Sequence, residues 1–406
     1  MLKKFFWAIS SLFFTVGYAQ VKTGIDVLEE LDFSPLEGKR VGLVTNPTGV
    51  DCQLRSTVDV LYASKKVQLK CLFAPEHGVR GNLYAGQLVK NTTDETTGLP
   101  VYSIHGSSRK PTAAMLQNID ALVYDIQDIG CRSYTFISSL GLCMEAAAEQ
   151  GKEVIVLDRP NPLGGLKVEG CGVKPGFFSF VSQFDIPYIY GLTVGELATY
   201  LNSNRPVEKR CRLTVIKMEG WKRTMTFDQT GLPWVPTSPQ IPSDETALFY
   251  PTTGIFGELS AVNIGVGYTL PFRVFAAKWI NAEKYAAAMN ALQLPGVVFR
   301  PISFKPYFSV GSGEMMHGVQ IYITDYERVR LTELQFYLVQ EIHRLWPDKD
   351  VFALGNPKSF SMFDNVCGTN QIRNKFGKRF LVSDILTLWR EGEDAFKEKS
   401  KAYWLY

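Results

Sequence analysis

Alternating strand-like and helical segments constrain the fold of this chain more than any other feature. The apolar, strand-like runs are residues 40–45, 67–74, 100–104, 121–124 and 154–157, and helical patterns fall at 56–63, 112–118 and 135–150. Almost continuously apolar runs are typical of strands buried on both faces of a parallel sheet, with helices as right-handed crossovers. The chain up to about residue 165 is therefore predicted to form a Rossmann-like α/β domain.

The pattern changes after residue 165, where glycine, proline and aromatic residues become frequent. Helices are predicted at 193–202, 282–292, 331–345 and 382–396, and strands at 212–218 and 318–323. Segment 232–251 contains five prolines, which predict a long irregular loop. Such loops are usually functional, and an inert surface excursion is the alternative. We expect two domains, 20–165 and 166–406, the second of α+β type, with a cleft between them.

Residues 1–19 resemble an export signal. Lys3 and Lys4 give a basic start, residues 5–16 are apolar, and small residues around Ala19 form a cleavage site. The apolar run is shorter than the ~20 residues that a membrane-spanning helix needs. We therefore expect a signal peptide cleaved near Ala19, no stable membrane insertion, and a periplasmic or secreted protein.

Composition and motifs exclude several classes of function. The chain has 43 Lys and Arg against 40 Asp and Glu, a balance that does not favour nucleic-acid binding. Segment 265–268 (GVGY) lacks the third glycine of a dinucleotide-binding loop, and no P-loop, nucleophile-elbow or H-E-x-x-H pattern occurs. The four histidines are far apart in sequence, so we expect neither a metal nor an organic cofactor. The seven scattered cysteines are predicted to be mostly buried free thiols, with one or two disulfides as the alternative.

Charged side chains follow three of the predicted strands, at positions where open α/β sheets bind ligands. Glu76 and His77 come after the strand 67–74, and Arg80 is close behind. Apolar neighbours at 73–75 would desolvate the Glu76 carboxyl, and desolvation favours the proton-donating form of such a group. Glu76 is thus a candidate catalytic acid, and an ion pair with Arg80 is the structural alternative.

Asp125 and Asp128 follow the strand 121–124, with Arg132 and Tyr134 shortly after. Carboxyls that converge with Glu76 would supply the pair that glycoside cleavage requires: one protonates the leaving oxygen, and the other activates water or stabilises the transition state. Capping of the predicted helix 135–150 by Asp128 is a compatible alternative.

Asp158 and Asn161 follow the strand 154–157 in the sequence Asp-Arg-Pro-Asn-Pro. The two prolines fix the backbone on either side of Asn161, which suits an amide that is presented to a sugar. A stiff hinge between domains is the alternative.

Five segments together resemble the signature blocks of the exo-β-N-acetylmuramidase family, long catalogued as a domain of unknown function. They are, in chain order, 73–81 (FAPEHGVRG), 125–130 (DIQDIG), 158–165 (DRPNPLGG), 192–197 (LTVGEL) and 234–239 (WVPTSP). The resemblance implies an exo-acting glycosidase that removes N-acetylmuramic acid from the non-reducing end of peptidoglycan fragments. It also implies a Rossmann-like domain, a second domain and a cleft between them, and it places the family's proposed catalytic glutamate at Glu76.

The chain departs from the family pattern at several positions. Segment 263–269 reads NIGVGYT where many members have Ser-Glu-Gly-Arg-Gly-Thr, so Ile264 and Val266 stand in place of charged residues. Leu270 replaces a frequent arginine, Ile189 and Tyr190 replace an Arg-His pair, and Gln87 replaces a glutamate. Fewer cations weaken the expected contact with the lactyl carboxylate of muramic acid, so another N-acetylated amino sugar is an alternative substrate.

The predicted site combines these strand-end clusters with the second-domain segment. The catalytic candidates are Glu76, Asp125 and Asp128. The candidates for substrate binding are His77, Arg80, Arg132, Tyr134, Asp158, Asn161, Asn263, Tyr268 and Thr269. A non-catalytic protein of the same fold that binds cell-wall sugars is the alternative function.

Overall fold

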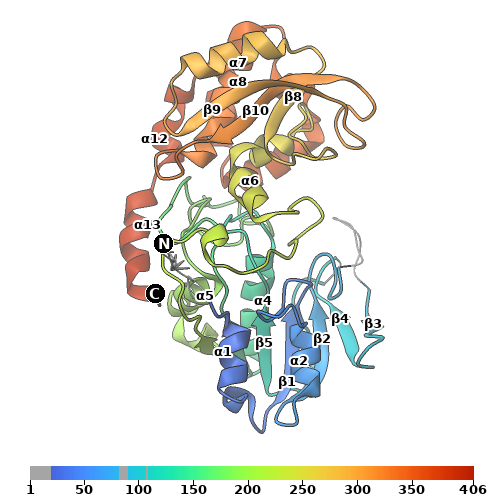
Figure 1. The fold of residues 1–406 in the computed structure, drawn as a ribbon. Helices are drawn as coiled ribbons and strands as arrows, with labels where there is room; N and C mark the ends of the chain where they lie inside the picture. Colours follow the sequence, from blue (N-terminus) through green and yellow to red (C-terminus); the bar gives the residue numbers. More distant parts are fainter. Residues whose placement is uncertain (1–19, 82–89, 107) are drawn as a thin grey trace, which may run out of the picture.

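The structure, a computed structural model, describes residues 20–81, 90–106 and 108–406. The predicted signal peptide and Gln87 lie outside the described residues. Two β-sheets stand at opposite ends of the molecule, and helix α6 (Asp244–Gly257) lies between them (Figure 1). The first sheet is mostly parallel and the second is antiparallel. The predicted fold class is therefore confirmed.

The first sheet has the strand order β3-β4-β2-β1-β5-β6-β7. Its strands are β1 (Arg40–Thr45), β2 (Gln68–Ala74), β3 (Thr92–Thr93), β4 (Pro100–Ser103), β5 (Ala121–Asp125), β6 (Glu153–Leu157) and β7 (Arg212–Ile216). The pairing is parallel except between β3 and β4. Strands β2 and β5 flank β1 on opposite sides, so the carboxyl ends of all three meet at one edge, where open α/β sheets bind ligands.

Helices cover both faces of this sheet because successive strand residues point to opposite sides. Leu122 and Tyr124 of β5 pack in one core cluster, whose helices are α3 (Ala113–Leu116), α4 (Phe136–Glu149) and α5 (Val194–Ser203). Ala121 and Val123 pack in another cluster, whose helices are α1 (Gly24–Glu30) and α2 (Thr57–Ala63). The result is a three-layer Rossmann-like sandwich.

The first sheet extends past the boundary predicted near residue 165. Strand β7 pairs with β6 from Glu153↔Arg212 to Leu157↔Ile216, although it lies in the segment assigned to the second domain. Ile129, Cys131 and Leu163 also belong to the core cluster of the second half. Each half therefore contributes residues to the other: β7 extends the first sheet, and residues before 165 pack in the core of the second half.

The second sheet has the order β8-β10-β9. Its strands are β8 (Val274–Ala277), β9 (Val297–Phe304) and β10 (Met316–Ile323), and the sequence pattern predicted only the last of them. Helix α7 (Ala282–Ala291) packs on this sheet and on α8 (Leu334–Leu345). The remaining helices are α9 (Val351–Leu354), α10 (Phe360–Cys367), α11 (Gln371–Arg379), α12 (Leu386–Trp389) and α13 (Glu393–Ser400). Short 3-10 helices occupy Ser34–Leu36, Val207–Lys209, Phe227–Gln229, Leu331–Glu333, Pro357–Ser359, Val382–Asp384 and Lys401–Tyr403.

Helix α6 corrects the prediction that segment 232–251 is irregular throughout, because it begins at Asp244 and continues through Pro251. Proline removes a helical hydrogen bond and normally breaks the ladder. Gln335 of α8 braces the turn that follows the proline: its Nε2 donates to the Pro251 carbonyl (3.1 Å), and its Oε1 accepts from the Ile255 amide (3.1 Å). A side chain from α8 thus bonds a carbonyl and an amide that lie one helical turn apart in α6.

The predicted last helix, 382–396, is divided into a 3-10 turn, α12 and α13. Gly392 causes the final break, since it takes a left-handed φ of 87° immediately before α13. All seven cysteines are free thiols, and six of them are buried, as the sequence predicted for most of them. None of the described helices has the length and apolar character that crossing a membrane requires.

Candidate active site

Glu76 lies just past the carboxyl end of β2, and three segments meet at its side chain. Its Oε2 accepts a hydrogen bond from Thr135 Oγ1 (2.9 Å), at the start of α4. His105 Nε2, just after β4, lies 3.9 Å from Glu76 Oε1. The Glu76 side chain is 22% exposed, so its carboxyl is held by the protein and still reaches solvent.

The turn that carries Glu76 has an unusual backbone. His77 takes a left-handed φ of 71° and Gly78 follows with 78°, while the His77 side chain is buried. A left-handed conformation is strained in a residue other than glycine, and such strain concentrates at functional sites. The backbone therefore supports a functional role for this turn.

Arg80 is engaged at a distance from the Glu76 carboxyl. Among the described residues, its ion pairs are with Asp94 (3.0 Å) and Asp59 (3.0 Å). The alternative of a Glu76–Arg80 ion pair is therefore wrong. The guanidinium that was expected to bind substrate instead joins α2 to the segment before β4.

Asp125 is completely buried and occupied within the protein. Arg159 binds both of its oxygens, with Nε 2.5 Å from Oδ1 and Nη2 2.9 Å from Oδ2, and Thr57 Oγ1 also donates to Oδ2. A bidentate ion pair of this kind fixes a carboxylate as an acceptor. The structure assigns Asp125 to this ion pair rather than to an acid pair with Glu76.

Asp128 is also buried, and its Oδ1 accepts hydrogen bonds from the Gly130 amide (2.8 Å) and the Tyr190 hydroxyl (2.8 Å). Its Oδ2 is buried without a partner among the described residues. Burial raises the pKa of Asp128 to about 7, against the opposing effect of these hydrogen bonds. Asp128 therefore braces the β5–α4 connection from inside, and it does not reach solvent beside Glu76.

Asp158 is completely buried and joins separate parts of the chain. Its oxygens accept from the Gly195 amide (2.8 Å), the Thr193 hydroxyl (2.7 Å) and the Tyr406 hydroxyl (2.7 Å). Burial raises the pKa of Asp158 to about 6. The residue anchors the start of α5 and the C-terminal tyrosine, which leaves no oxygen for a substrate.

Asn161 is likewise structural. Its Nδ2 donates to the Leu192 carbonyl (2.9 Å), and its Oδ1 accepts from the Leu163 amide (2.9 Å). Gly130 gives it room, since a Cβ at residue 130 would lie 2.3 Å from Asn161 Oδ1. Asn161 is buried and both of its polar atoms bind backbone, so the structure shows this amide engaged within the fold.

Arg132 and Tyr134 lie where the two halves of the molecule meet. Arg132 is completely buried and donates to the carbonyls of Cys171 (2.6 Å), Ile186 (2.6 Å) and Val366 (3.0 Å). Tyr134 is half-buried and donates to Thr237 Oγ1 (2.8 Å), in the proline-rich segment. Arg132 is thus a structural clamp, while Tyr134 remains next to the Glu76 turn through its neighbour Thr135.

Of the three candidates in the second domain, Asn263 is buried, and Tyr268 and Thr269 are more accessible. Asn263 is buried, donates to the Val310 carbonyl (2.7 Å) and accepts from the Gly265 amide (2.7 Å). The Tyr268 ring is half-buried and stacks on Phe304 at 4.6 Å, and Thr269 is exposed. Only Tyr268 and Thr269 of this group have side chains that solvent can reach.

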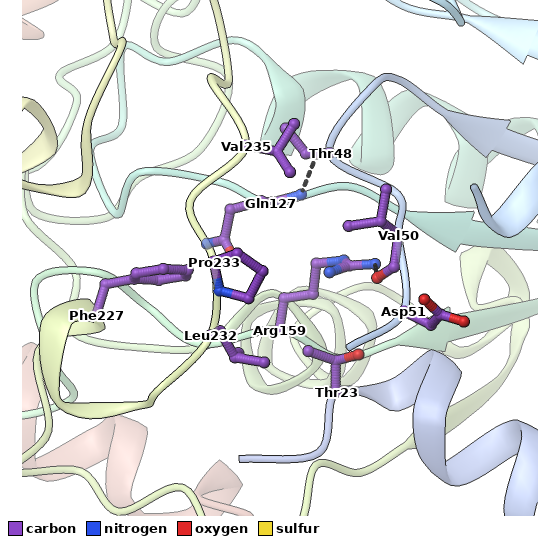
Figure 2. A pocket seen from close by; sticks show the side chains of 10 residues that line it. All are labelled: Thr23, Thr48, Val50, Asp51, Gln127, Arg159, Phe227, Leu232, Pro233 and Val235. Carbon is purple, nitrogen blue, oxygen red and sulfur yellow. Dashed lines mark hydrogen bonds between the residues drawn. The ribbon is translucent and has the colours of Figure 1, made fainter. Parts of the chain in front are cut away.

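A pocket opens at the carboxyl ends of β1, β5 and β6 (Figure 2). Gln127 and Arg159 line it, and the backbone amide of Gln127 donates to Thr48 Oγ1 (2.8 Å). The proline-rich segment closes one side of the pocket with residues 232, 233 and 235. The other lining residues are Thr23, Val50, Asp51 and Phe227. Glu76 is not among the residues that line this pocket. Within the described ranges, no group of three or more His, Cys, Asp or Glu side chains is placed to hold a metal ion.

Two family models match nearly the whole chain. The model described as Exo-beta-N-acetylmuramidase NamZ, N-terminal, matches residues 41–245, and that described as Exo-beta-N-acetylmuramidase NamZ, C-terminal, matches residues 248–406. The chain belongs to the NamZ family. The division between the two NamZ models falls within α6, rather than near residue 165.

Relatives of known name or structure agree with this membership. The chain is 42% identical over 392 residues to the peptidoglycan β-N-acetylmuramidase NamZ of Bacillus subtilis strain 168, an alignment that covers 97% of this chain and 93% of the relative. A DUF1343 family protein of Bacteroides fragilis superposes with a TM-score of 0.92 at 54% identity, covering 95% of this chain and 99% of that one. A second one from the same organism has a TM-score of 0.76 at 28% identity, covering 96% and 99%.

The departures from the NamZ family pattern have structural consequences here. Ile189 and Tyr190 are buried, and the Tyr190 hydroxyl binds Asp128, so neither side chain is placed to contact a substrate carboxylate. Sequence reasoning missed Thr135 and His105, which the structure places against Glu76. The position of Thr135, at the start of the helix that follows two strand-end aspartates, was the available signal for the first; nothing local indicated the second.

Proposed function

We propose that this protein is an exo-acting glycoside hydrolase that releases N-acetylmuramic acid from the non-reducing end of peptidoglycan fragments. The observation that carries the proposal is the position of Glu76. It stands in the segment that resembles the catalytic block of the NamZ family, at a strand end, with its carboxyl oriented by Thr135 and partly open to solvent. We assign the catalytic carboxyl to Glu76 and retain His77, Tyr134, Tyr268 and Thr269 as candidates for substrate contact.

The sugar specificity is the finer part of the proposal. Ile264, Val266 and Leu270 bring no charge to the segment 263–270, so recognition of a lactyl carboxylate would depend on other groups. A related N-acetylated amino sugar is therefore the alternative substrate. Comparison of an N-acetylmuramide with an N-acetylglucosaminide that carries the same chromogenic leaving group separates the two, since only the lactyl group differs between them.

The test of catalysis uses the wild type, Glu76→Gln and the control Glu37→Gln, in which an exposed glutamate is changed. We expect Glu76→Gln to lower turnover by about 10²- to 10⁴-fold, the usual contribution of one acid–base group. Glu37→Gln should match the wild type. Equal turnover by Glu76→Gln and the wild type would refute the assignment, and binding of fragments by the wild type without hydrolysis over days would favour the non-catalytic sugar-binding protein.

We further propose that the protein is exported. The basic start at Lys3 and Lys4, the apolar run and the small residues near Ala19 support this proposal, and a peptidoglycan substrate lies outside the inner membrane. Intact mass of the protein recovered from its native cells should correspond to a chain that begins at Gln20. Recovery of the unprocessed chain in the cytoplasm would contradict it.

A further inference from the structure

The two aspartates predicted as partners of Glu76 are both engaged inside the protein. Asp125 is held by Arg159 and Thr57, and Asp128 is buried against Tyr190. Glycosidases that use two carboxyl groups need a second one at the site, beside the first. A two-carboxyl mechanism here would take its second carboxyl from elsewhere in the chain, and the following inference rests on the proposed function.

Glu258 follows the last residue of α6 and has three energetic costs in this position. It is half-buried, and among the described residues no hydrogen bond or ion pair reaches its carboxyl. It also stands at the C-terminus of a helix, where the macrodipole disfavours a negative charge. Burial alone raises the pKa of Glu258 to about 7. Natural proteins tolerate such a group mainly where function requires it.

Tyr250 connects the same helix to the Glu76 turn. Its ring lies along Gly254, one helical turn closer to Glu258, since a Cβ on that glycine would be 3.7 Å from the ring. The Tyr250 hydroxyl is 3.1 Å from Ser133 Oγ, and its ring packs against Tyr134 at 5.8 Å. The next residue along, Thr135, donates to Glu76.

The charges of the two glutamates act on neighbouring tyrosines of this contact. Glu76 contributes to raising the pKa of Tyr134, and Glu258 contributes to raising the pKa of Tyr250, although burial is the main cause for both rings. Because the two rings touch each other, the Tyr134–Tyr250 pair connects the surroundings of Glu76 and Glu258. One carboxyl comes from the first sheet and the other from the helix between the two sheets (Figure 1).

We propose that Glu258 is the second carboxyl of the glycosidase site and the group that donates a proton to the leaving oxygen. In this scheme the glycosidic C–O bond breaks as Glu258 transfers its proton to the departing sugar oxygen. Water supplies a hydroxyl to the anomeric carbon, and Glu76 accepts the proton that the water releases. Both carboxyls then exchange protons with solvent and return to their starting forms.

The test compares kcat of Glu258→Gln and of the wild type on two substrates that differ in their leaving group. A proton donor matters most when the leaving group is a poor one, such as a sugar alkoxide, and least when it is an acidic nitrophenol. We expect about a 10²-fold or greater loss of kcat with a disaccharide and less than about a tenfold loss with the nitrophenyl glycoside. The alkaline limb of the wild-type kcat/KM profile, expected near pH 7, should disappear in the variant.

The Tm of Glu258→Gln shows whether the variant folds as the wild type does. Removal of an unpaired, half-buried carboxylate should raise the Tm at pH 8, whereas the Tm should match the wild type near pH 4, where both carry a neutral side chain at this position. Glu245→Gln, an exposed glutamate at the favourable end of the same helix, should keep wild-type activity and pH dependence.

The outcomes separate this inference from the proposed function. If the wild type hydrolyses the substrates and Glu76→Gln does not, but Glu258→Gln keeps its rates and its alkaline limb, the role of Glu258 is refuted and the proposed function stands. An equal loss with both leaving groups also refutes proton donation. A wild type that releases no sugar removes both proposals.

Discussion

The hydroxyl of Thr135 donates a hydrogen bond of 2.9 Å to Oε2 of Glu76 and makes no capping bond to its own helix. A threonine at the N-cap position normally accepts a hydrogen bond from an amide of the first helical turn. Here the oxygen faces the strand-end glutamate instead. The start of α4 is therefore built to orient Glu76.

Replacement of Thr135 should affect activity much more than stability. Thr135→Val keeps the shape and removes the donor, and the loss of a hydrogen bond to a charged group, about 1.5–3 kcal/mol, corresponds to roughly 10- to 150-fold in kcat/KM. Thr135→Ser keeps the hydroxyl and should stay within about threefold of wild type. Thermal unfolding should change little, because no helix cap is lost. A Thr135→Val variant with full activity would show that the hydrogen bond does not orient the catalytic group.

His105 should make the protein sensitive to acid. Burial lowers the pKa of His105, partly offset by the charge of Glu76, while Arg109 and His77 lower it further. The folded state thus prefers a neutral ring, so stability is lost as pH falls below about 6.5, where the unfolded chain binds a proton.

His105→Phe should reduce this sensitivity. The new ring carries no titratable group. It would lie near Phe180, whose ring centroid is 6.4 Å from that of His105. We expect the Tm of the variant to fall less than that of the wild type between pH 6.5 and pH 5, measured by thermal unfolding. Parallel curves would contradict a half-buried, neutral His105.

Asp125 should contribute to stability rather than to chemistry. Asp125→Asn leaves the Arg159 guanidinium buried without its carboxylate, and breaking a buried pair of this kind typically costs about 3–5 kcal/mol. Urea unfolding should show this loss, while kcat per folded molecule stays near the wild-type value. Asp120→Asn, which breaks the exposed pair with Arg40, is the control and should change stability little. A large fall in kcat without destabilisation would restore Asp125 as a catalytic candidate.

Asp128 should lower stability as pH rises. Its folded pKa of about 7 exceeds the usual value of 3.8, so the favourable state is the protonated one. Stability should fall between about pH 4 and pH 7 by roughly 4 kcal/mol at most, from the size of the shift. Asp128→Asn cannot ionise, and its unfolding free energy, measured in urea at pH 4, 6 and 8, should depend less on pH. Identical slopes in both proteins would show that Asp128 is ionised throughout.

The sequence by itself determined the strand–helix alternation of the first sheet and the placement of Glu76 at a strand end. Both depend on local properties, namely hydrophobic periodicity and the residue that follows a strand. The five segments of the family pattern added the membership that the comparisons confirm.

Only the tertiary structure decided which strand-end groups are open to solvent, because their partners lie far away in sequence. Arg159 is 34 residues from Asp125 and Tyr190 is 62 residues from Asp128, and packing rather than local pattern brings them together. Helix α6 also depends on a distant partner, since Gln335, 84 residues from Pro251, donates to the carbonyl of that proline. Periodicity can predict which side chains leave a strand end, but burial and distant partners decide which of them remain available for chemistry.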